Sequence, residues 1–223
     1  MIEAVIKVGG SLSRGDRLPA LCQQLGNSGR RYRLLVVPGG GPFADAVRAQ
    51  DRRFGLGDAA AHWMAILGMD QYGWQLADLV PDSEPVWDLS TARAVAAAGR
   101  LPVLLPFALL HAADPLPHSW EVTSDSIAAW VAATVGAPLL ILLKDVDGLF
   151  DGSPVQGRTT FRRRTSVSLE QLAQCEGVDG YLAHLLERSG LKLWVLNGER
   201  PERLAELLVQ GFTLGTHWGP GVA

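Results

Sequence analysis

Two glycine-rich turns, each placed directly after a short apolar segment, constrain the fold of this chain more than any other feature. The segment 2–8 runs into Gly9 and Gly10, and the segment 34–37 runs into Pro38 and the three glycines 39–41. Because glycine has no Cβ, a phosphate oxygen can closely approach the backbone N–H groups of such turns. Two turns of this kind favour a parallel sheet, in which ligands bind outside the carboxyl ends of the strands.

The residues beside these turns have the chemistry of a phosphate site. Lys7 adds a compact positive charge that can follow a moving phosphoryl group, and Ser11 is placed to cap the segment that follows. The helix expected after the triple glycine would add a partial positive charge at the same edge of the sheet. A tight turn after a buried strand would explain either glycine motif alone, without any ligand.

Strand-like and helix-like segments alternate along the chain, and we find no linker that divides it. This alternation predicts an α/β fold, a three-layer αβα sandwich around a mostly parallel central sheet. We expect one domain over residues 1–223, with lobes of about 1–120 and 121–223, and an irregular segment at 107–121. The expected strands are 2–8, 34–37, 86–88, 102–105, 139–143 and 191–196, and the expected helices are 17–25, 42–54, 58–79, 91–98, 126–135, 166–172, 179–189 and 201–209.

Charge and composition exclude several classes of partner. The net charge of −3 provides no field that would attract nucleic acid or a membrane surface, and the apolar run 137–143 is too short to span a bilayer. Cys22 and Cys175 form no disulfide framework, which fits a reducing cytoplasm, and no secretory signal is recognised. The five histidines lack metal-ligand spacing, so no metal site built from side chains is expected.

Five motifs in series resemble those of the amino acid kinase family, which includes acetylglutamate, aspartate, carbamate, uridylate and isopentenyl phosphate kinases. The motifs are Lys7 to Ser11, Val37 to Pro42, Thr123 to Ala129, Lys144 to Phe150, and Asn197-Gly198 with Gly215-Thr216. The resemblance covers nearly the whole chain. It implies the carbamate kinase-like fold, phosphoryl transfer from ATP to a small acceptor, and Mg²⁺ held mostly by nucleotide phosphates and water. Relatives are oligomers, and the apolar circumference of the segment 58–79 agrees with a homo-oligomer.

The resemblance also implies roles for individual residues. Lys7 would contact the transferred phosphoryl group and Asp125 would orient the lysines, although Asp125 could also cap the helix after it. Residues 178–184 lack the Gly-Gly-Met-x-x-Lys pattern of several relatives, and we expect Lys144 to supply the missing charge. The first lobe would bind the acceptor and the second the nucleotide. The implied nucleotide- and phosphate-binding residues are Lys7, Gly9, Gly10, Ser11, Lys144, Asp145, Asp147, Gly148, Leu149 and Phe150, and the implied acceptor-binding residues are Gly39, Gly40, Gly41, Asp70, Trp120, Thr123 and Ser124.

A narrower resemblance comes from residues 62–73, which are similar to the branch of the family that contains the kinase for aminomethyl-furanmethyl phosphate in methanofuran biosynthesis. This implies conversion of a furan phosphate and ATP to a furan diphosphate and ADP. Asp70 would meet the ammonium group of the acceptor, and Trp63, Tyr72 or Trp120 would stack on its ring. These aromatic residues fit equally well as helix core or surface.

Two alternatives remain open. One is a carboxylate or carbamate kinase of the same family, against which the missing lysine pattern argues. The other is a non-catalytic storage or sensor protein that binds ATP and oxyanions.

Overall fold

The strands of this protein form one seven-stranded sheet in a computed structural model that describes residues 1–150 and 162–220. The strands are β1 Ala4–Val8, β2 Leu34–Pro38, β3 Ser83–Val86, β4 Leu101–Leu104, β5 Leu139–Lys144, β6 Lys192–Asn197 and β7 Thr216–Trp218. Their order is β3-β4-β2-β1-β5-β6-β7, and every neighbouring pair is parallel except β6 and β7. The prediction of a mostly parallel α/β sheet is therefore confirmed.

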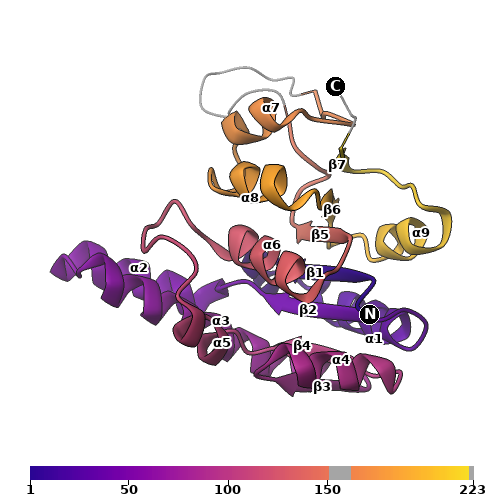
Figure 1. Cartoon of the computed structure of the whole chain (residues 1–223), viewed down its shortest axis with the longest axis horizontal. Coiled ribbons are helices and arrows are strands. Elements are labelled where there is room, and N and C mark those ends of the chain that lie inside the picture. Colours follow the sequence, from indigo (N-terminus) through magenta and orange to yellow (C-terminus); the bar gives the residue numbers. More distant parts are fainter. Residues whose placement is uncertain (151–161, 221–223) are drawn as a thin grey trace.

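Helices cover both faces of the sheet, which gives the three predicted layers (Figure 1). The helices are the 3-10 helix η1 Gly10–Arg14, then α1 Leu18–Gly29, α2 Gly41–Phe54, α3 Asp58–Leu79, α4 Leu89–Ala97, α5 Phe107–Ala113, α6 Ser124–Val135, α7 Leu169–Gln174, α8 Leu182–Ser189 and α9 Glu202–Gln210. One face packs against α1, α9 and the second half of α3, and the other face packs against α4, α6 and α8. None of the described helices is both long and apolar enough to cross a membrane.

The register of the central strands brings the predicted motifs to one edge of the sheet. Val8, the last residue of β1, pairs with Pro38 of β2 and with Leu143 of β5. The residues of β1 are all buried, as expected for a strand covered on both faces. The glycine turns after β1 and β2 and the loop after β5 therefore begin side by side at the carboxyl edge.

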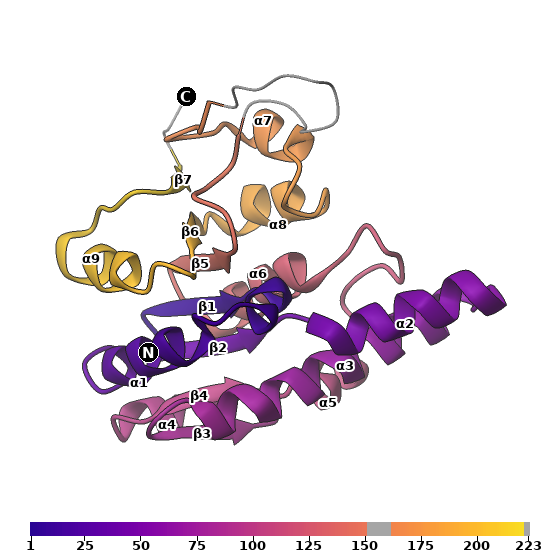
Figure 2. The same cartoon turned by 180° about the vertical axis from the view of Figure 1, so that it is seen from behind.

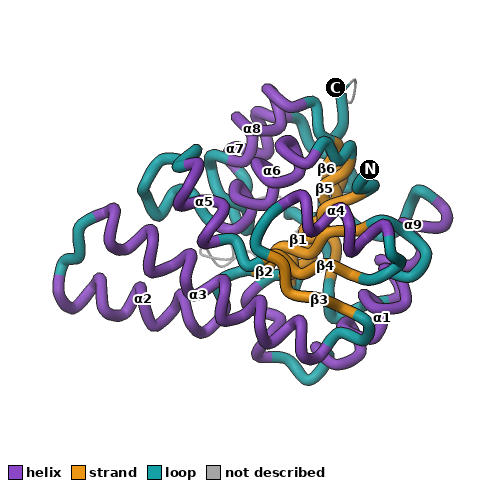
Figure 3. Tube along the Cα trace, turned by 60° about the horizontal axis from the view of Figure 1, so that its bottom comes forward, coloured by secondary structure: helices purple, strands orange, loops and turns teal. Residues whose placement is uncertain are grey.

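The helices α2 and α3 form an arm that extends beyond this carboxyl edge (Figure 3). Gly55, with a φ of 64°, ends α2 in the left-handed conformation that glycine adopts without strain. The connection between α5 and α6 reaches toward this arm (Figure 2), where the Trp120 indole Nε1 donates to Asp51 Oδ2 on α2 over 2.8 Å. Residues of the arm, of this connection and of the turns at the carboxyl edge line one cavity.

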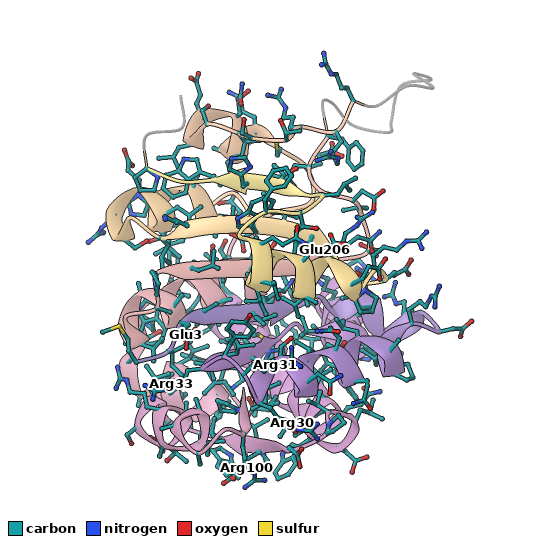
Figure 4. The ribbon with its side chains drawn as sticks, turned by 90° about the vertical axis from the view of Figure 1, so that its right-hand side faces the viewer. Glu3, Arg30, Arg31, Arg33, Arg100 and Glu206 are labelled. Atoms are coloured by element: carbon teal, nitrogen blue, oxygen red, sulfur yellow. The ribbon has the colours of Figure 1, made fainter. Side chains whose placement is uncertain are left out.

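The amino edge of the sheet carries exposed ion pairs. Figure 4 views this side and shows Glu3, Arg33 and Arg100 around it. Arg100 pairs with Glu84, and Arg30 pairs with Asp82. Exposed pairs of this kind stabilise a fold by at most about 1 kcal/mol each, so this edge contributes a solvated surface and little stability.

The structure corrects several predicted elements. The segment predicted to be irregular contains the helix α5, because the carboxylate Oδ1 of Asp70 on α3 accepts from the first N–H of α5, that of Phe107, over 3.0 Å. The short strand predicted at 86–88 is β3 at Ser83–Val86, and α1 continues to Gly29. The strand β7 was not predicted, because its three residues are ordered by antiparallel pairing with β6.

Candidate active site

A buried carboxylate between two lysines forms the centre of the candidate site. Lys7 near the end of β1 and Lys144 at the end of β5 both reach Asp125 in the first turn of α6. Lys7 Nζ lies 2.8 Å from Asp125 Oδ1, and Lys144 Nζ donates to Asp125 Oδ2 over 2.7 Å. Asp125 is 2% exposed and Lys7 is 5% exposed. The three residues that the sequence motifs singled out for catalysis therefore lie together.

The charges of this cluster depend on one another. Burial lowers the pKa of Lys7, the nearby Asp125 raises it, and Lys144 lowers it. Burial would raise the pKa of Asp125, yet the two neighbouring lysines lower it to about 2. With Asp125 ionised and both lysines in their charged forms, the cluster carries one net positive charge, which suits an anionic phosphoryl group.

The two glycine turns pack directly against each other beside the lysines. A Cβ on Gly39 would lie 2.7 Å from the N of Gly10, and a Cβ on Gly10 would overlap the backbone of Gly41. The N–H of Gly9 donates to Leu143 O and the N–H of Gly39 donates to Val8 O, each over 2.8 Å, so the sheet uses both. Gly10 is the first residue of η1, where the N–H group has no partner inside the helix.

Two adjoining cavities meet at the lysine cluster. One has a volume of about 430 Å³ and opens toward the α2–α3 arm, and the other, of about 660 Å³, lies on the side of α8. Lys7, Lys144 and Trp120 line both cavities. Volumes of several hundred Å³ are those of small-molecule sites. The predicted site residues that line one or both cavities are Lys7, Gly9, Gly10, Ser11, Gly40, Gly41, Trp120, Thr123, Ser124, Asp125, Lys144 and Asp145.

Asp70, predicted to meet an ammonium group of the acceptor, lines neither cavity. Its carboxylate instead accepts from the first N–H of α5, and burial raises its pKa to about 6. Gly39 also lines neither cavity, because it packs against the first glycine turn. The acidic residues that line the cavity toward the arm are Asp45, Asp58 and Asp145.

The loop after β5 is held in place by the second half of the chain. Asp147 accepts from Asn197 Nδ2 over 2.8 Å and from Arg203 Nη1 over 2.6 Å, and these bonds lower its pKa. The N–H of Leu149 donates to Thr216 Oγ1 over 2.8 Å. The residues from Asp147 to Phe150 thus line neither cavity, and they shape the loop that begins at Asp145.

Several residues at this site were missed by the sequence analysis. Arg14 and Arg48 line the cavity toward the arm, where both pair with Asp45. The guanidinium of Arg48 lies 4.6 Å from the centre of the Trp120 ring. His62 and Asp179 were also missed. The sequence does show one basic residue soon after each glycine turn, and this pattern could have indicated the two arginines.

The first turn of α6 begins earlier than predicted. Thr123 is its N-cap residue and Ser124 its first residue, so Asp125 lies inside the helix and the alternative of a capping Asp125 is wrong. The cap comes from Asp179, which accepts from the N–H groups of Thr123 and Ser126 over 3.0 Å each. Asp179 belongs to the segment 178–184, which lacks the lysine pattern of several relatives.

Comparison with known proteins places this geometry in context. A model of the amino acid kinase family matches residues 3–186. The [5-(aminomethyl)furan-3-yl]methyl phosphate kinase of Methanocaldococcus jannaschii is 28% identical over 208 residues, which cover 92% of each chain. The uridylate kinase of Methanoculleus marisnigri is 27% identical over 236 residues, which cover 97% of this chain and 95% of the relative. The crystal structure of uridylate kinase from Archaeoglobus fulgidus matches with a TM-score of 0.75 at 21% sequence identity. The match covers 97% of this chain and 99% of the uridylate kinase chain.

Proposed function

We propose, from the premise that this chain belongs to the amino acid kinase family, that it transfers the γ-phosphoryl group of ATP to a small phosphate monoester. The match over residues 3–186 establishes the membership and confirms the resemblance seen in the sequence motifs. The chain is therefore a kinase that uses ATP and a small-molecule substrate. The alternative of a non-catalytic storage or sensor protein loses its support.

The pair of arginines at the cavity toward the arm carries the proposal of a phosphate acceptor. Arg14 and Arg48 line this cavity in addition to the two lysines. A phosphate monoester carries up to two negative charges, and guanidinium groups bind phosphate oxygens in a bidentate manner. A carboxylate group that accepts the phosphoryl group carries only one negative charge and requires fewer cations around it. The relatives named for a furan-methyl phosphate and for uridylate support the same class of acceptor.

The proposed reaction is a direct displacement. A phosphate oxygen of the acceptor attacks the γ-phosphorus, and the bond from that phosphorus to the bridging oxygen of ADP breaks. Lys7 and Lys144 would stabilise the negative charge of the transferred group, the N–H of Gly10 would donate to it, and Asp125 would keep the lysines in place. We propose that residues 1–120 hold the acceptor and that residues 121–223 hold the nucleotide.

Magnesium enters this proposal only with the nucleotide. Within residues 1–150 and 162–220, no group of three histidine, cysteine or acidic side chains could hold a metal ion. We therefore expect Mg²⁺ to be bound mainly by the ATP phosphates and by water, as hard cations often are in kinases.

The ring of the acceptor is the finer part of the proposal. Trp120 and His62 line the cavity toward the arm and offer aromatic faces or edges to a planar ring. An aminomethyl-furanmethyl phosphate fits this description, and its ammonium group would meet one of the cavity carboxylates, of which Asp58 lies on the arm. Asp58 thus replaces Asp70 as the proposed partner of the ammonium group.

The test is an ADP-release assay with Mg·ATP and a panel of acceptors: aminomethyl-furanmethyl phosphate, UMP, isopentenyl phosphate, acetylglutamate, glutamate and carbamate. We expect turnover on the furan phosphate and none on the carboxylates. Arg48→Gln should raise the KM of the phosphate acceptor at least about tenfold and leave the KM of ATP unchanged. Arg52→Gln, on the same helix but outside the cavity, is the matched control. Turnover on a carboxylate alone would overturn the phosphate acceptor.

We also propose that the protein is a homo-oligomer, on the basis of an exposed apolar stripe on α3. Met64, Leu67 and Trp74 lie on one side of this helix and are 37%, 42% and 53% exposed. Trp87 packs edge to face against Trp74, with 5.9 Å between ring centres, and is 48% exposed. Sedimentation velocity should show a dimer or larger species that Trp74→Glu dissociates, and a monomeric wild-type protein would contradict this.

A further inference from the structure

Asp179 makes an unusually complete set of hydrogen bonds for a side chain next to a binding cavity. Its carboxylate is buried between the beginnings of α6 and α8. Oδ2 accepts from Thr123 N over 3.0 Å, from Thr123 Oγ1 over 2.8 Å and from Ser126 N over 3.0 Å. Oδ1 accepts from Ser126 Oγ and, over 3.0 Å, from Leu182 N.

These contacts replace the cap that α6 does not make for itself. The N-cap residue Thr123 accepts no capping hydrogen bond with its own side chain. The first N–H groups of a helix have no partner inside the helix, and a negative charge at this end also interacts favourably with the helix dipole. Asp179, from a distant part of the chain, supplies both the hydrogen-bond acceptor and the negative charge. It also accepts from the N–H of Leu182, the first residue of α8.

The first turn of α6 is also the turn that carries Asp125. Ser126, the next residue, donates both its N–H and its hydroxyl to Asp179, so the backbone on one side of Asp125 is fixed by the distant carboxylate. Thr123, two residues before Asp125, is fixed by the same carboxylate. Asp125 in turn holds the ammonium groups of Lys7 and Lys144.

We propose that Asp179 is a positioning residue for phosphoryl transfer: it fixes the first turn of α6 so that Asp125 holds Lys7 and Lys144 against the reacting phosphoryl group. The inference rests on the proposed role of the two lysines. Asp179 lines the same cavity as Asp125 and both lysines, so its charge acts on the site as well as its hydrogen bonds. The segment 178–184 lacks a phosphate-binding lysine. It contributes instead a carboxylate that acts on the two lysines through Asp125.

The electrostatic effect of Asp179 agrees in direction with this role. The charged groups that act on the Lys7 ammonium are Asp125, Lys144 and Asp179, and both carboxylates raise the pKa of Lys7 against the lowering by burial and by Lys144. Loss of the Asp179 charge should therefore lower the pKa of Lys7 further. A residue with a purely structural role elsewhere in the fold would leave that pKa unchanged.

The experiment compares Asp179→Ala and Asp179→Asn with Asp88→Asn, a matched control. Asp88 caps α4 by accepting from Thr91 N over 2.8 Å, and it lines neither cavity. We expect kcat to fall about 100-fold in Asp179→Ala, with the KM values of ATP and acceptor within about twofold, because misplacement of catalytic groups by about 1 Å has an effect of this size. Asp179→Asn should lose about tenfold, because its amide oxygen still accepts, and Asp88→Asn should keep the wild-type kcat.

A wild-type kcat in a folded Asp179→Ala protein would overturn the proposal. If that variant does not fold, Asp179→Asn decides, and Ser126→Ala, which removes one contact and keeps the carboxylate, should still lower kcat severalfold. A second readout does not depend on turnover: the ¹⁵N side-chain NMR signal of Lys7, assigned with Lys7→Arg, should titrate at a lower pH in Asp179→Asn than in the wild type. An unchanged titration would overturn the proposal even if no acceptor is found, whereas absent turnover in the wild type would count only against the proposed function.

Discussion

The substitution Asp125→Asn separates the structural role of the buried carboxylate from its role in catalysis. Asp125 is 2% exposed and forms ion pairs with Lys7 at 2.8 Å and with Lys144 at 2.7 Å. Asparagine has nearly the same shape but no charge, so the ammonium groups of Lys7 and Lys144 would lie near each other without the carboxylate between them. We expect the variant to fold, to lose stability at neutral pH and to lose phosphoryl transfer.

The size of this loss follows from the pKa of Asp125. The two lysines outweigh burial and lower this pKa from 3.8 to about 2, and one pKa unit corresponds to about 1.4 kcal/mol, so the folded environment favours the carboxylate by about 2 kcal/mol. Removing one partner of a buried ion pair costs about 3–5 kcal/mol, because the remaining charge is left unpaired. We therefore expect the free energy of unfolding to fall by about 3 kcal/mol at pH 7, within the typical total of about 5–15 kcal/mol.

The loss should depend on pH on both sides of neutrality. Without the carboxylate that raises it, the pKa of Lys7 in the folded variant falls further below its unfolded value of about 10.4. Between the pKa of Lys7 in the folded variant and its pKa in the folded wild type, only the variant binds fewer protons than its unfolded chain. In that range the stability of the variant therefore rises with pH while that of the wild type does not, and the deficit shrinks. In acid, the wild type alone loses the contribution of Asp125 as the pH falls from about 4 to about 2, so the deficit shrinks there too.

Urea unfolding followed by tryptophan fluorescence at pH 3, 7 and 9.5 measures this deficit. The matched control is Asp82→Asn, which removes an exposed partner of Arg30 and should change the free energy of unfolding by at most about 1 kcal/mol at any of these pH values. A deficit in Asp125→Asn that is no larger than that of the control, or that does not shrink between pH 7 and 9.5, would refute the coupling of the three charges.

Three further outcomes are expected. Lys7→Ala should fold and lose at least about 100-fold in kcat, because an electrostatic contact to the transferred phosphoryl group is removed; a folded variant with near wild-type turnover in the ADP-release assay would contradict the mechanism. Gly10→Ala should destabilise the fold by about 2 kcal/mol or more in urea unfolding, because its Cβ would overlap the backbone of Gly41, whereas Gly57→Ala, with open space around it, should not. Burial raises the pKa of Asp70 to about 6, so the folded protein loses stability as the pH rises through about 4 to 6 and this carboxyl group ionises. Asp70→Asn should therefore have a higher free energy of unfolding than the wild type above pH 6, by about 1 kcal/mol after allowance for partial exposure. The KM of the acceptor should be unchanged.

The parts of the fold that the sequence predicts are those determined by neighbouring residues. A strand buried on both faces must be apolar throughout, and β1, β2 and β5 follow this rule closely enough to be located within two residues. A glycine turn at the end of a strand also depends on local sequence, since no Cβ fits between Gly10 and Gly41. The side-by-side placement of these strand ends then follows from the parallel topology.

The parts that the sequence does not predict depend on contacts between distant residues. The helix α5 begins where Asp70 binds the N–H of Phe107, 37 residues later in the chain, and no local pattern in 107–121 indicates it. The cap of α6 comes from Asp179, which follows Ser126 by 53 residues. An aspartate in either position looks like an ordinary polar residue in the sequence, and only the packing of the helices shows which amide it binds.

The charge balance of the site connects these structural features with phosphoryl transfer. Two lysines share the Asp125 carboxylate, so these three side chains together carry a net positive charge when both lysines are protonated. Asp179 lies farther from the Lys7 ammonium group and acts on it electrostatically, without a direct ion pair. A buried net charge is unfavourable unless it is paired. Binding of an anionic phosphoryl group would complete the pairing, and the resulting attraction grows as negative charge accumulates on the transferred oxygens. The same excess charge that limits the stability of the free protein therefore favours the transition state, and we expect Asp179 to place that charge through its hydrogen bonds to the first turn of α6.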